Sequence, residues 1–168
     1  MSERHTVVIG LGNPIMGDDG VGLAALARLT DEYELPADVE LVDGGTWGMN
    51  LLPLIEDAGR VLLLDAIHKD GAPGAPYRLS RDELPRYLAT KISPHQVDLH
   101  DVLALAELRG TLPADTVAVG VQPERVEMIA ELSPAVAAAV GSIVAMAVAE
   151  LTAWGHRLEP KRVAAAHA

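Results

Sequence analysis

The sequence of 168 residues contains no cysteine and no phenylalanine, and it has only two tryptophans and three tyrosines. Without cysteine, the chain cannot form disulfides, use a thiol nucleophile or bind a metal through thiolates. The absence of cysteine also fits a reducing compartment, so we expect a cytoplasmic protein. Because aromatic residues are scarce, the core must be built from Leu, Val, Ile and Ala. A single domain of this length can bury such a core.

Positive charge is scarce as well, since 13 Lys and Arg residues stand against 24 Asp and Glu residues and give a formal net charge of −11. A surface this acidic repels nucleic acid and anionic lipid, and it suits a basic partner or a cation. The N-terminus has no apolar run before a small-residue cleavage site, so we expect no signal peptide. The longest apolar stretch, residues 135–149, is shorter than the ~20 residues of a membrane span. We therefore expect a core helix and no membrane insertion.

Strand patterns alternate with helix patterns along the chain. We predict strands over residues 6–12, 39–45, 60–67, 77–79 and 115–124. We predict helices over residues 19–35, 48–59, 94–108 and 133–155, with a capping box at Ser80 and Glu83 starting one brief helix more. This order indicates the α/β class: a three-layer sandwich in which helices flank a mostly parallel, twisted sheet of about five strands. The strand at 77–79 follows too short a crossover for a parallel neighbour, so we expect it to be antiparallel.

No repeat or linker divides the chain, so we expect a single α/β domain over residues 1–155. Residues 156–168 lack a strong pattern, and we expect them to form a mobile C-terminal tail. Four of the six histidines fall in loops, at termini or near helix ends, where we expect them to be solvated: His5, His68, His156 and His167.

Acidic residues follow the first three predicted strands. Asp18 and Asp19 follow the first, Asp43 lies at the end of the second, and Asp65 lies at the end of the third. Ligands of open α/β sheets bind at this edge. An N-cap role explains one of Asp18 and Asp19 but not both, and Asp43 also fits a turn residue before two glycines. Asp65 interrupts an apolar run, where burying an unpaired charge is costly, so we expect it to face a site.

His95 is the most informative histidine. In "SPHQ", Ser93 is an N-cap candidate, Pro94 fits the first helical position and Gln96 completes a capping box. The positive end of the helix dipole favours a neutral imidazole, which suits a metal ligand or a hydrogen-bond acceptor. The spacing fits an ordinary surface residue of a capped turn equally well. His100 lies about 140° further around the helix and cannot share a face with His95.

Other catalytic and nucleotide-binding motifs are absent. "GLGNPIMG" does not match the dinucleotide-binding G-x-G-x-x-G, and the chain has no G-x-S-x-G, no H-E-x-x-H and no phosphate-loop lysine. "GLGNP" is similar to the opening of peptidyl-tRNA hydrolases, but the histidine segment of those enzymes does not follow here. Two carboxylates and one imidazole would suit a borderline divalent metal such as nickel or zinc.

Four segments together resemble the hydrogenase maturation proteases, the endopeptidases that process the large subunit of nickel–iron hydrogenases. They are "GLGNPIMGDDGVG", "VELVDGGTWGMNLLPLIEDAGRVLLLDAI", "KISPHQVDLHDVL" and "VAVGVQPE". The resemblance implies that the chain removes a short C-terminal extension from the large-subunit precursor once nickel has been inserted. "ISPHQ" and "DGGT" are most similar to the branch that serves membrane-bound or uptake hydrogenases.

The resemblance also implies a metal site. The family's acidic residue after the first strand, the aspartate ending the third strand and the histidine match Asp19, Asp65 and His95. Some members have Glu at the first position, and Asp shortens the reach while keeping the ligand type. Asp43 matches the acidic residue of "DGGT" and is given a supporting catalytic role, which leaves Asp18 as the cap candidate. Whether the metal activates water or carbonyl, or an aspartate acts as general base, stays open.

By the same resemblance, nickel arrives with the precursor, and other divalent ions can occupy the site in isolation. We expect a monomer that pairs transiently with the precursor and binds no nucleic acid. Two other functions stay open: a peptidyl-tRNA hydrolase-like enzyme, and a non-enzymatic nickel-binding maturation chaperone. Cleavage of the precursor would separate them from the protease.

Overall fold

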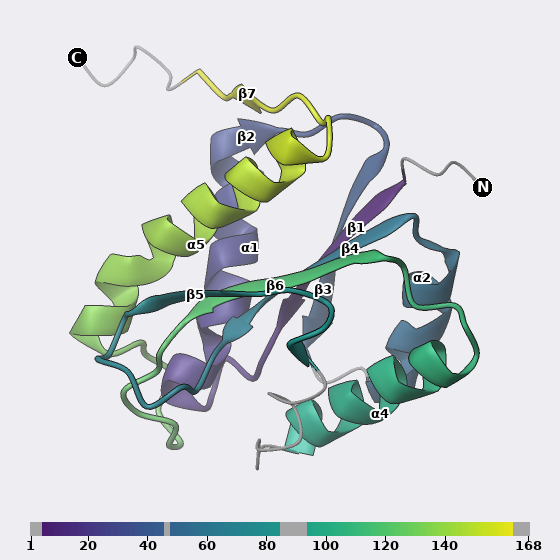
Figure 1. Ribbon diagram of the computed structural model, residues 1–168. Coiled ribbons are helices and arrows are strands. Elements are labelled where there is room, and N and C mark those ends of the chain that lie inside the picture. Colours follow the sequence, from purple (N-terminus) through teal and green to yellow (C-terminus); the bar gives the residue numbers. More distant parts are fainter. Residues whose placement is uncertain (1–4, 46–47, 85–93, 163–168) are drawn as a thin grey trace.

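The computed structural model describes residues 5–45, 48–84 and 94–162, and for residues 94–100 it describes the backbone alone. A five-stranded sheet in the order β3–β1–β4–β6–β5 forms its centre (Figure 1). The strands are β1 (Thr6–Leu11), β3 (Val39–Gly45), β4 (Arg60–Ala66), β5 (Pro76–Leu79) and β6 (Asp115–Val121). Four strands are parallel, and β5 pairs antiparallel with β6 at one edge. The predicted sheet and its antiparallel edge are confirmed.

Helices cover both faces of the sheet, as the predicted three-layer sandwich requires (Figure 1). One face carries α1 (Val21–Glu32) and α5 (Pro134–Ala153), and the other carries α2 (Leu52–Asp57) and α4 (Pro94–Leu108). Two short 3₁₀ helices follow β1 and β3: η1 (Gly17–Gly20) and η2 (Gly48–Leu51). The observed α4 has the bounds that the sequence predicts.

Side chains of the central strands alternate between two hydrophobic clusters. Along β4, Leu62 and Leu64 belong to the cluster under α1 and α5, whereas Val61 and Leu63 belong to the cluster under α2 and α4. All four are at most 1% exposed. Parallel strands covered on both faces are expected to be apolar on both faces. The alternation also fixes the direction in which the polar residues at the strand ends point.

Several predicted elements differ in detail from the observed ones. The helix predicted over residues 19–35 begins at Val21, because "GDDG" forms η1, and ends at Glu32, because Tyr33–Glu34 forms the short strand β2. The helix predicted over 48–59 divides into η2 and α2, with a proline in the first turn of α2, where its missing N–H costs nothing. The last predicted strand ends at Val121 instead of residue 124, because Gln122 bonds a neighbouring loop.

Ser80 and Glu83 form one half of the predicted capping box, in which the glutamate carboxylate bonds back to the serine. The backbone N–H and the hydroxyl of Ser80 donate to Oε1 of Glu83 at 3.1 and 2.9 Å. These hydrogen bonds lower the pKa of Glu83. Beyond Leu84, the helix that the box was predicted to start lies outside the described residues.

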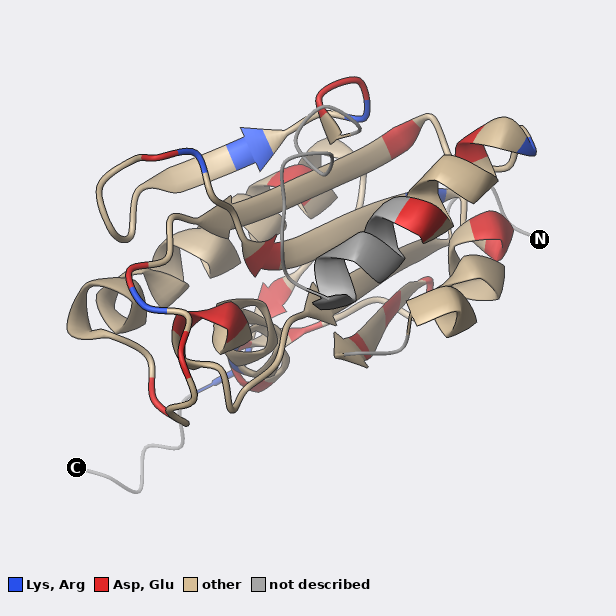
Figure 2. Ribbon diagram, turned by 90° about the horizontal axis from the view of Figure 1, so that it is seen from below, with Lys and Arg blue, Asp and Glu red and all other residues tan. Residues whose placement is uncertain are grey.

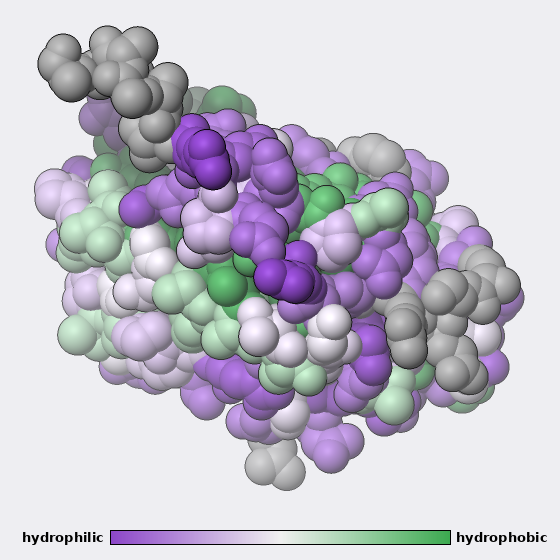
Figure 3. Space-filling model, turned by 90° about the horizontal axis from the view of Figure 1, so that it is seen from above, coloured by the Kyte–Doolittle hydropathy of each residue, from purple (hydrophilic) through white to green (hydrophobic). Residues whose placement is uncertain are grey.

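The segment predicted as a tail contacts the domain over its first residues. β7 (Glu159–Pro160) pairs antiparallel with β2 (Tyr33–Glu34), and the Lys161 N–H donates to the Glu32 carbonyl at 2.8 Å. The prediction that His156 is solvated is wrong, because its exposed fraction is 6%. Figure 3 views this end of the molecule from above and shows hydrophilic residues interspersed with hydrophobic ones. Residues 163–168 lie outside the described chain.

Among the described helices, α5 is the one that is long and apolar enough to cross a membrane, by length and composition alone. Seven of its residues are buried against α1 and the sheet: Val136, Ala139, Val140, Ile143, Val144, Ala147 and Leu151. They recur at helical spacing, as the predicted core helix requires.

Candidate functional site

Glycines bring the loop after β1 against the end of β4. Gly12 has φ 117°, and a Cβ there would lie 1.8 Å from the carbonyl oxygen of Asp19. A Cβ at Gly22 would lie 2.2 Å from the carbonyl oxygen of Leu64 and 2.6 Å from that of Leu11. Because no side chain fits at either position, the chain turns tightly and the start of α1 packs directly on both strands. Asp19 is thereby placed at the carboxyl edge of the sheet, as the sequence predicts.

Asp19 and Asp65 are both almost completely buried, with exposed fractions of 3% and 4%. Oδ2 of Asp19 accepts the N–H of Asn13 at 2.9 Å, and Oδ1 of Asp65 accepts the N–H of Ala66 at 2.8 Å. Asp19 follows β1, and Asp65 is the last residue but one of the adjacent parallel strand β4. A backbone N–H thus orients each carboxylate at the same edge, where two buried acids favour a cation.

Asp65 points toward the face of the sheet that α4 covers. By the alternation along β4 and the residues that follow it, Asp65 shares a face with Leu63 and Ile67, which both lie in the cluster under α2 and α4. His95 is the second residue of α4. The structure therefore brings the backbone of His95 to the face toward which Asp65 points. The side chains of His95 and Gln96, and all of Ser93, lie outside the described residues.

Within the described part of the chain, no group of three His, Asp or Glu side chains is arranged to hold a metal. The donor set that the sequence predicts includes His95, whose side chain is not described. Two carboxylates and an imidazole remain a donor set that borderline divalent ions accept.

Asp43 lies apart from Asp65. It is exposed, and it pairs across the sheet with Gly10 of β1, so that β1 separates it from β4. Along β3, alternation places Asp43 on the same face as Val39 and Leu41, which pack with α1 and α5. The structure therefore places Asp43 on the opposite face from Asp65, and its supporting catalytic role stays a prediction.

Asp18 is not the helix cap that the sequence predicts, because neither η1 nor α1 has a side-chain cap hydrogen bond. Asp18 is fully buried and accepts four hydrogen bonds from the loop after β6. The donors are the N–H groups of Glu124, Arg125 and Ser133 at 2.8, 2.9 and 2.7 Å, and the Ser133 hydroxyl at 2.8 Å. These partners are 106 to 115 residues away in the sequence, so no local pattern could have revealed them.

The hydrogen bonds keep the Asp18 carboxylate ionised. Burial by itself raises the pKa of Asp18, but the backbone N–H groups of Arg125, Ser133 and Glu124 and the Ser133 hydroxyl outweigh it, so the pKa lies below its ordinary value. Hydrogen bonds to a carboxylate favour its charged form. A buried negative charge therefore ties the loop after β6 to η1.

Gln122 has a similar role at the end of β6 and was not recognised from the sequence. It is 6% exposed, and its Oε1 accepts the N–H of Lys69 at 2.7 Å and of Gly71 at 3.2 Å. The amide thereby fixes the loop that follows Asp65. A polar residue after an apolar strand, followed by proline in "VQPE", was the available signal.

Acidic residues are frequent on this edge. Figure 2, seen from below, shows η1 and the loop after β6 with red segments, next to few blue ones. The geometry supports two kinds of chemistry: binding of a cation by oriented carboxylates, and proton transfer by a carboxylate.

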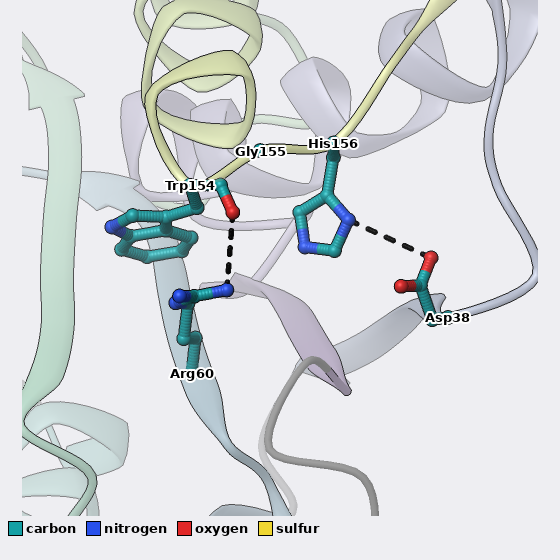
Figure 4. Close-up of a pocket in the computed structure, with 5 residues that line it drawn as sticks. All are labelled: Asp38, Arg60, Trp154, Gly155 and His156. Carbon is teal, nitrogen blue, oxygen red and sulfur yellow. Dashed lines mark hydrogen bonds and ion pairs between the residues drawn. The ribbon is translucent and has the colours of Figure 1, made fainter.

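A cavity lies at the opposite end of the sheet, where β3 and β4 begin (Figure 4). Its volume is about 360 Å³, and it is lined by Asp38, Arg60, Trp154, Gly155 and His156. Nη1 of Arg60 donates to the Trp154 carbonyl at 3.1 Å, and Nδ1 of His156 lies 3.6 Å from Oδ1 of Asp38. This cavity includes none of the predicted site residues.

Burial favours the neutral form of His156 at this cavity. Its Nε2 lies 2.7 Å from the hydroxyl oxygen of Thr6. Burial lowers the pKa of His156, the Asp38 carboxylate opposes that shift, and the charge of Arg60 adds to it, so the pKa lies below its ordinary value. We interpret the cavity as the place where the C-terminal segment is fastened to β1.

Comparison with known proteins gives a consistent result. A family model described as hydrogenase maturation protease matches residues 23–150. The hydrogenase expression/formation protein HupD of Rhodobacter capsulatus is 38% identical over 154 residues, covering 90% of this chain and 73% of that protein. The hydrogenase 2 maturation protease of Escherichia coli K12 is 36% identical over 156 residues, covering 92% and 95%. The solved hydrogenase maturating endopeptidase HybD from E. coli aligns with a TM-score of 0.89 at 35% identity, covering 94% of this chain and 98% of that one.

Proposed function

The chain belongs to the hydrogenase maturation protease family, and we propose that it is an endopeptidase that removes the C-terminal extension of a nickel–iron hydrogenase large-subunit precursor after nickel insertion. The alignment with an endopeptidase over 94% of the chain carries this proposal. The buried carboxylates at the ligand-binding edge of the sheet support it.

In this proposal, Asp19, Asp65 and His95 recognise the inserted nickel by binding it, which we call nickel reading. The ion arrives with the precursor, so it is part of the substrate, and the three side chains complete its coordination. Imidazole and carboxylate are both suitable ligands for nickel. The Asn13 and Ala66 N–H groups hold the two carboxylates in place before the precursor binds. The carboxylates therefore lose little orientational freedom on binding.

Nickel serves mainly to dock the precursor in this proposal. Hydrolysis of the peptide bond also requires a group that accepts a proton from the attacking water. We propose that an aspartate carboxylate at this edge accepts that proton, because a carboxylate beside the bound precursor would lie within reach of the attacking water. The scissile bond is then placed by the docked metal.

The first test compares purified protein on nickel-loaded and nickel-free precursor. We expect the loaded precursor to be shortened and the nickel-free precursor to stay intact, measured by intact-mass spectrometry. Equal cleavage of both forms would contradict nickel reading. Binding of the loaded precursor without shortening would instead indicate a nickel-binding chaperone.

The second test uses Asp65→Asn and His95→Ala, which we expect to fold but to lose processing by about 100-fold or more, as loss of a positioned group at the reacting centre does. Asp70→Asn is the matched control. Asp70 is exposed on the loop after β4 and has φ 57°, a conformation that Asn also tolerates. Wild-type turnover by Asp65→Asn or His95→Ala would remove that residue from the site.

A further inference from the structure

Large hydrophobic side chains are exposed at six described positions, and their distribution is uneven. Four lie on the loops that follow β1 and β6, and we call them the apolar patch: Ile15, Val126, Met128 and Ile129, exposed by 53%, 41%, 80% and 38%. The other two are Met49 in η2 and Leu108 at the end of α4. Exposed hydrophobic side chains gathered in one area are typical of an interaction surface.

The two loops that carry the apolar patch are joined to each other. The N–H of Gly17 donates to the carbonyl of Ile129 at 2.6 Å, and the N–H of Asp18 donates to the carbonyl of Arg125 at 2.8 Å. A Cβ at Gly17 would lie 2.7 Å from the Arg125 carbonyl oxygen, so the loops are in direct contact. The buried carboxylate of Asp18 adds four hydrogen bonds. The patch is therefore formed before any partner binds, which reduces the entropic cost of docking.

The apolar patch also borders the candidate active site. Asp19 follows Asp18 directly, and its Oδ2 accepts the N–H of Asn13, two residues before Ile15. A protein that presents a metal ion to Asp19 and Asp65 would cover neighbouring surface, and the patch is part of that surface.

Charge indicates what kind of partner fits. The loop after β6 carries three exposed acidic residues, Glu124, Glu127 and Glu131, against one exposed basic residue, Arg125. The whole chain has a formal net charge of −11. In a symmetric contact with a second copy, the same acidic residues would face each other and repel. An apolar segment flanked by Lys or Arg complements both the hydrophobic side chains and the surrounding charge.

We infer that the apolar patch docks the hydrogenase large-subunit precursor through an apolar segment of that protein flanked by Lys or Arg. The inference rests on the proposed function and extends it to a contact surface outside the metal-reading residues. Met128 is the principal anchor, because it is the most exposed side chain of the patch.

The experiment measures the affinity of nickel-loaded precursor for wild type, Met128→Gln and Leu108→Gln by calorimetry. Met128→Gln should bind about tenfold more weakly, the loss expected when one large apolar side chain is no longer buried on binding. Leu108→Gln is the matched control, because Leu108 is 85% exposed at the other end of the sheet. Both variants should keep the wild-type melting temperature. In the cleavage assay, Met128→Gln should raise KM and leave kcat unchanged, and added salt should weaken binding by wild type.

Equal affinity of Met128→Gln and wild type for the precursor would overturn the inference. It would also be overturned if wild type were a dimer and the Met128→Gln variant a monomer. Binding that strengthens with added salt would overturn the assignment of a basic flank. If wild type binds the precursor but never shortens it, the proposed function fails while the two variants still decide the docking surface. If wild type cleaves and Met128→Gln matches it in KM, the docking inference alone fails. Absence of binding by wild type would overturn both.

Discussion

Asp18 and His156 are buried titratable residues at opposite ends of the same sheet, and both have a lowered pKa. For the carboxylate of Asp18, this shift means that the charge is kept. For the imidazole of His156, it means that the charge is lost. Asp18 stays ionised because four donors satisfy it, whereas His156 has one hydroxyl at 2.7 Å and a carboxylate at 3.6 Å. At the carboxyl edge of the sheet, the stabilising group is therefore a carboxylate whose hydrogen bonds are satisfied. At the amino edge of the sheet, it is a neutral imidazole.

Removal of Asp18 should have the largest effect on stability. Asp18→Ala leaves four donors without their acceptor, two of them buried and two part-buried, so we expect the free energy of unfolding to fall by about 3–5 kcal/mol. Urea denaturation measures the change. Glu131→Gln, an exposed change on the loop after β6, should stay within about 0.5 kcal/mol of wild type. An Asp18→Ala variant as stable as Glu131→Gln would show that the four hydrogen bonds contribute little.

His156 should make stability depend on pH in a different window from Asp18. Because the folded pKa of His156 lies below its ordinary value of 6.5, the unfolded state binds more protons as the pH falls below 6.5. The contribution of His156 is therefore complete above that pH and is lost as the pH falls toward the folded pKa. In urea denaturation at a series of pH values, His156→Gln should show a flatter decline than wild type. Parallel curves would contradict this account.

Asp18 is a carboxylate, so its lowered pKa affects stability in a more acidic range of pH. Its folded pKa lies below its ordinary value of 3.8, so its contribution is present above that value and is lost as the pH falls through the folded pKa. Subtracting the stability curves of the two variants from that of wild type should therefore separate the His156 window from the more acidic Asp18 window.

The smallest effect is expected from Arg60→Met. Arg60 donates to the Trp154 carbonyl and to Oδ2 of Asp115, both at 3.1 Å, and its side chain is 24% exposed. Loss of these bonds should lower the free energy of unfolding by about 0.5–1.5 kcal/mol. Because the charge of Arg60 lowers the pKa of His156, the variant should also show a flatter pH dependence. An unchanged pH profile would show that Arg60 does not act on His156.

The sequence predicted most of the fold because its periodic signals are local. The apolar run of β4 and the spacing in α5 identify a buried strand and a core helix. The position of Asp65 at the end of that strand was sufficient to place it at the ligand-binding edge. Asp19 was placed by the same argument, with the glycine loop as a second signal.

Long-range contacts were not predictable in this way. Asp18 has the local pattern of a helix cap, and only the folded chain brings Glu124, Arg125 and Ser133 to it. His156 has the local pattern of a tail residue, and its burial depends on Thr6, 150 residues away. Asp43 follows a strand as Asp65 does, but strand alternation turns it to the other face. In each case the local pattern was uninformative about the partner, and for Asp18 and His156 it also predicted the wrong surroundings.

Ser133 gives the Asp18 network a consequence for the order of folding. Ser133 is the N-cap of α5, but its hydroxyl donates to Asp18 and makes no cap bond within the helix. The contact joins the first loop of the chain to a residue 115 positions later. Contacts this distant form late, because the long intervening loop must close first. During synthesis, β1 and β4 can therefore pair before the hydrogen bonds of Asp18 are complete, because those bonds require residues 124–133, which are made later.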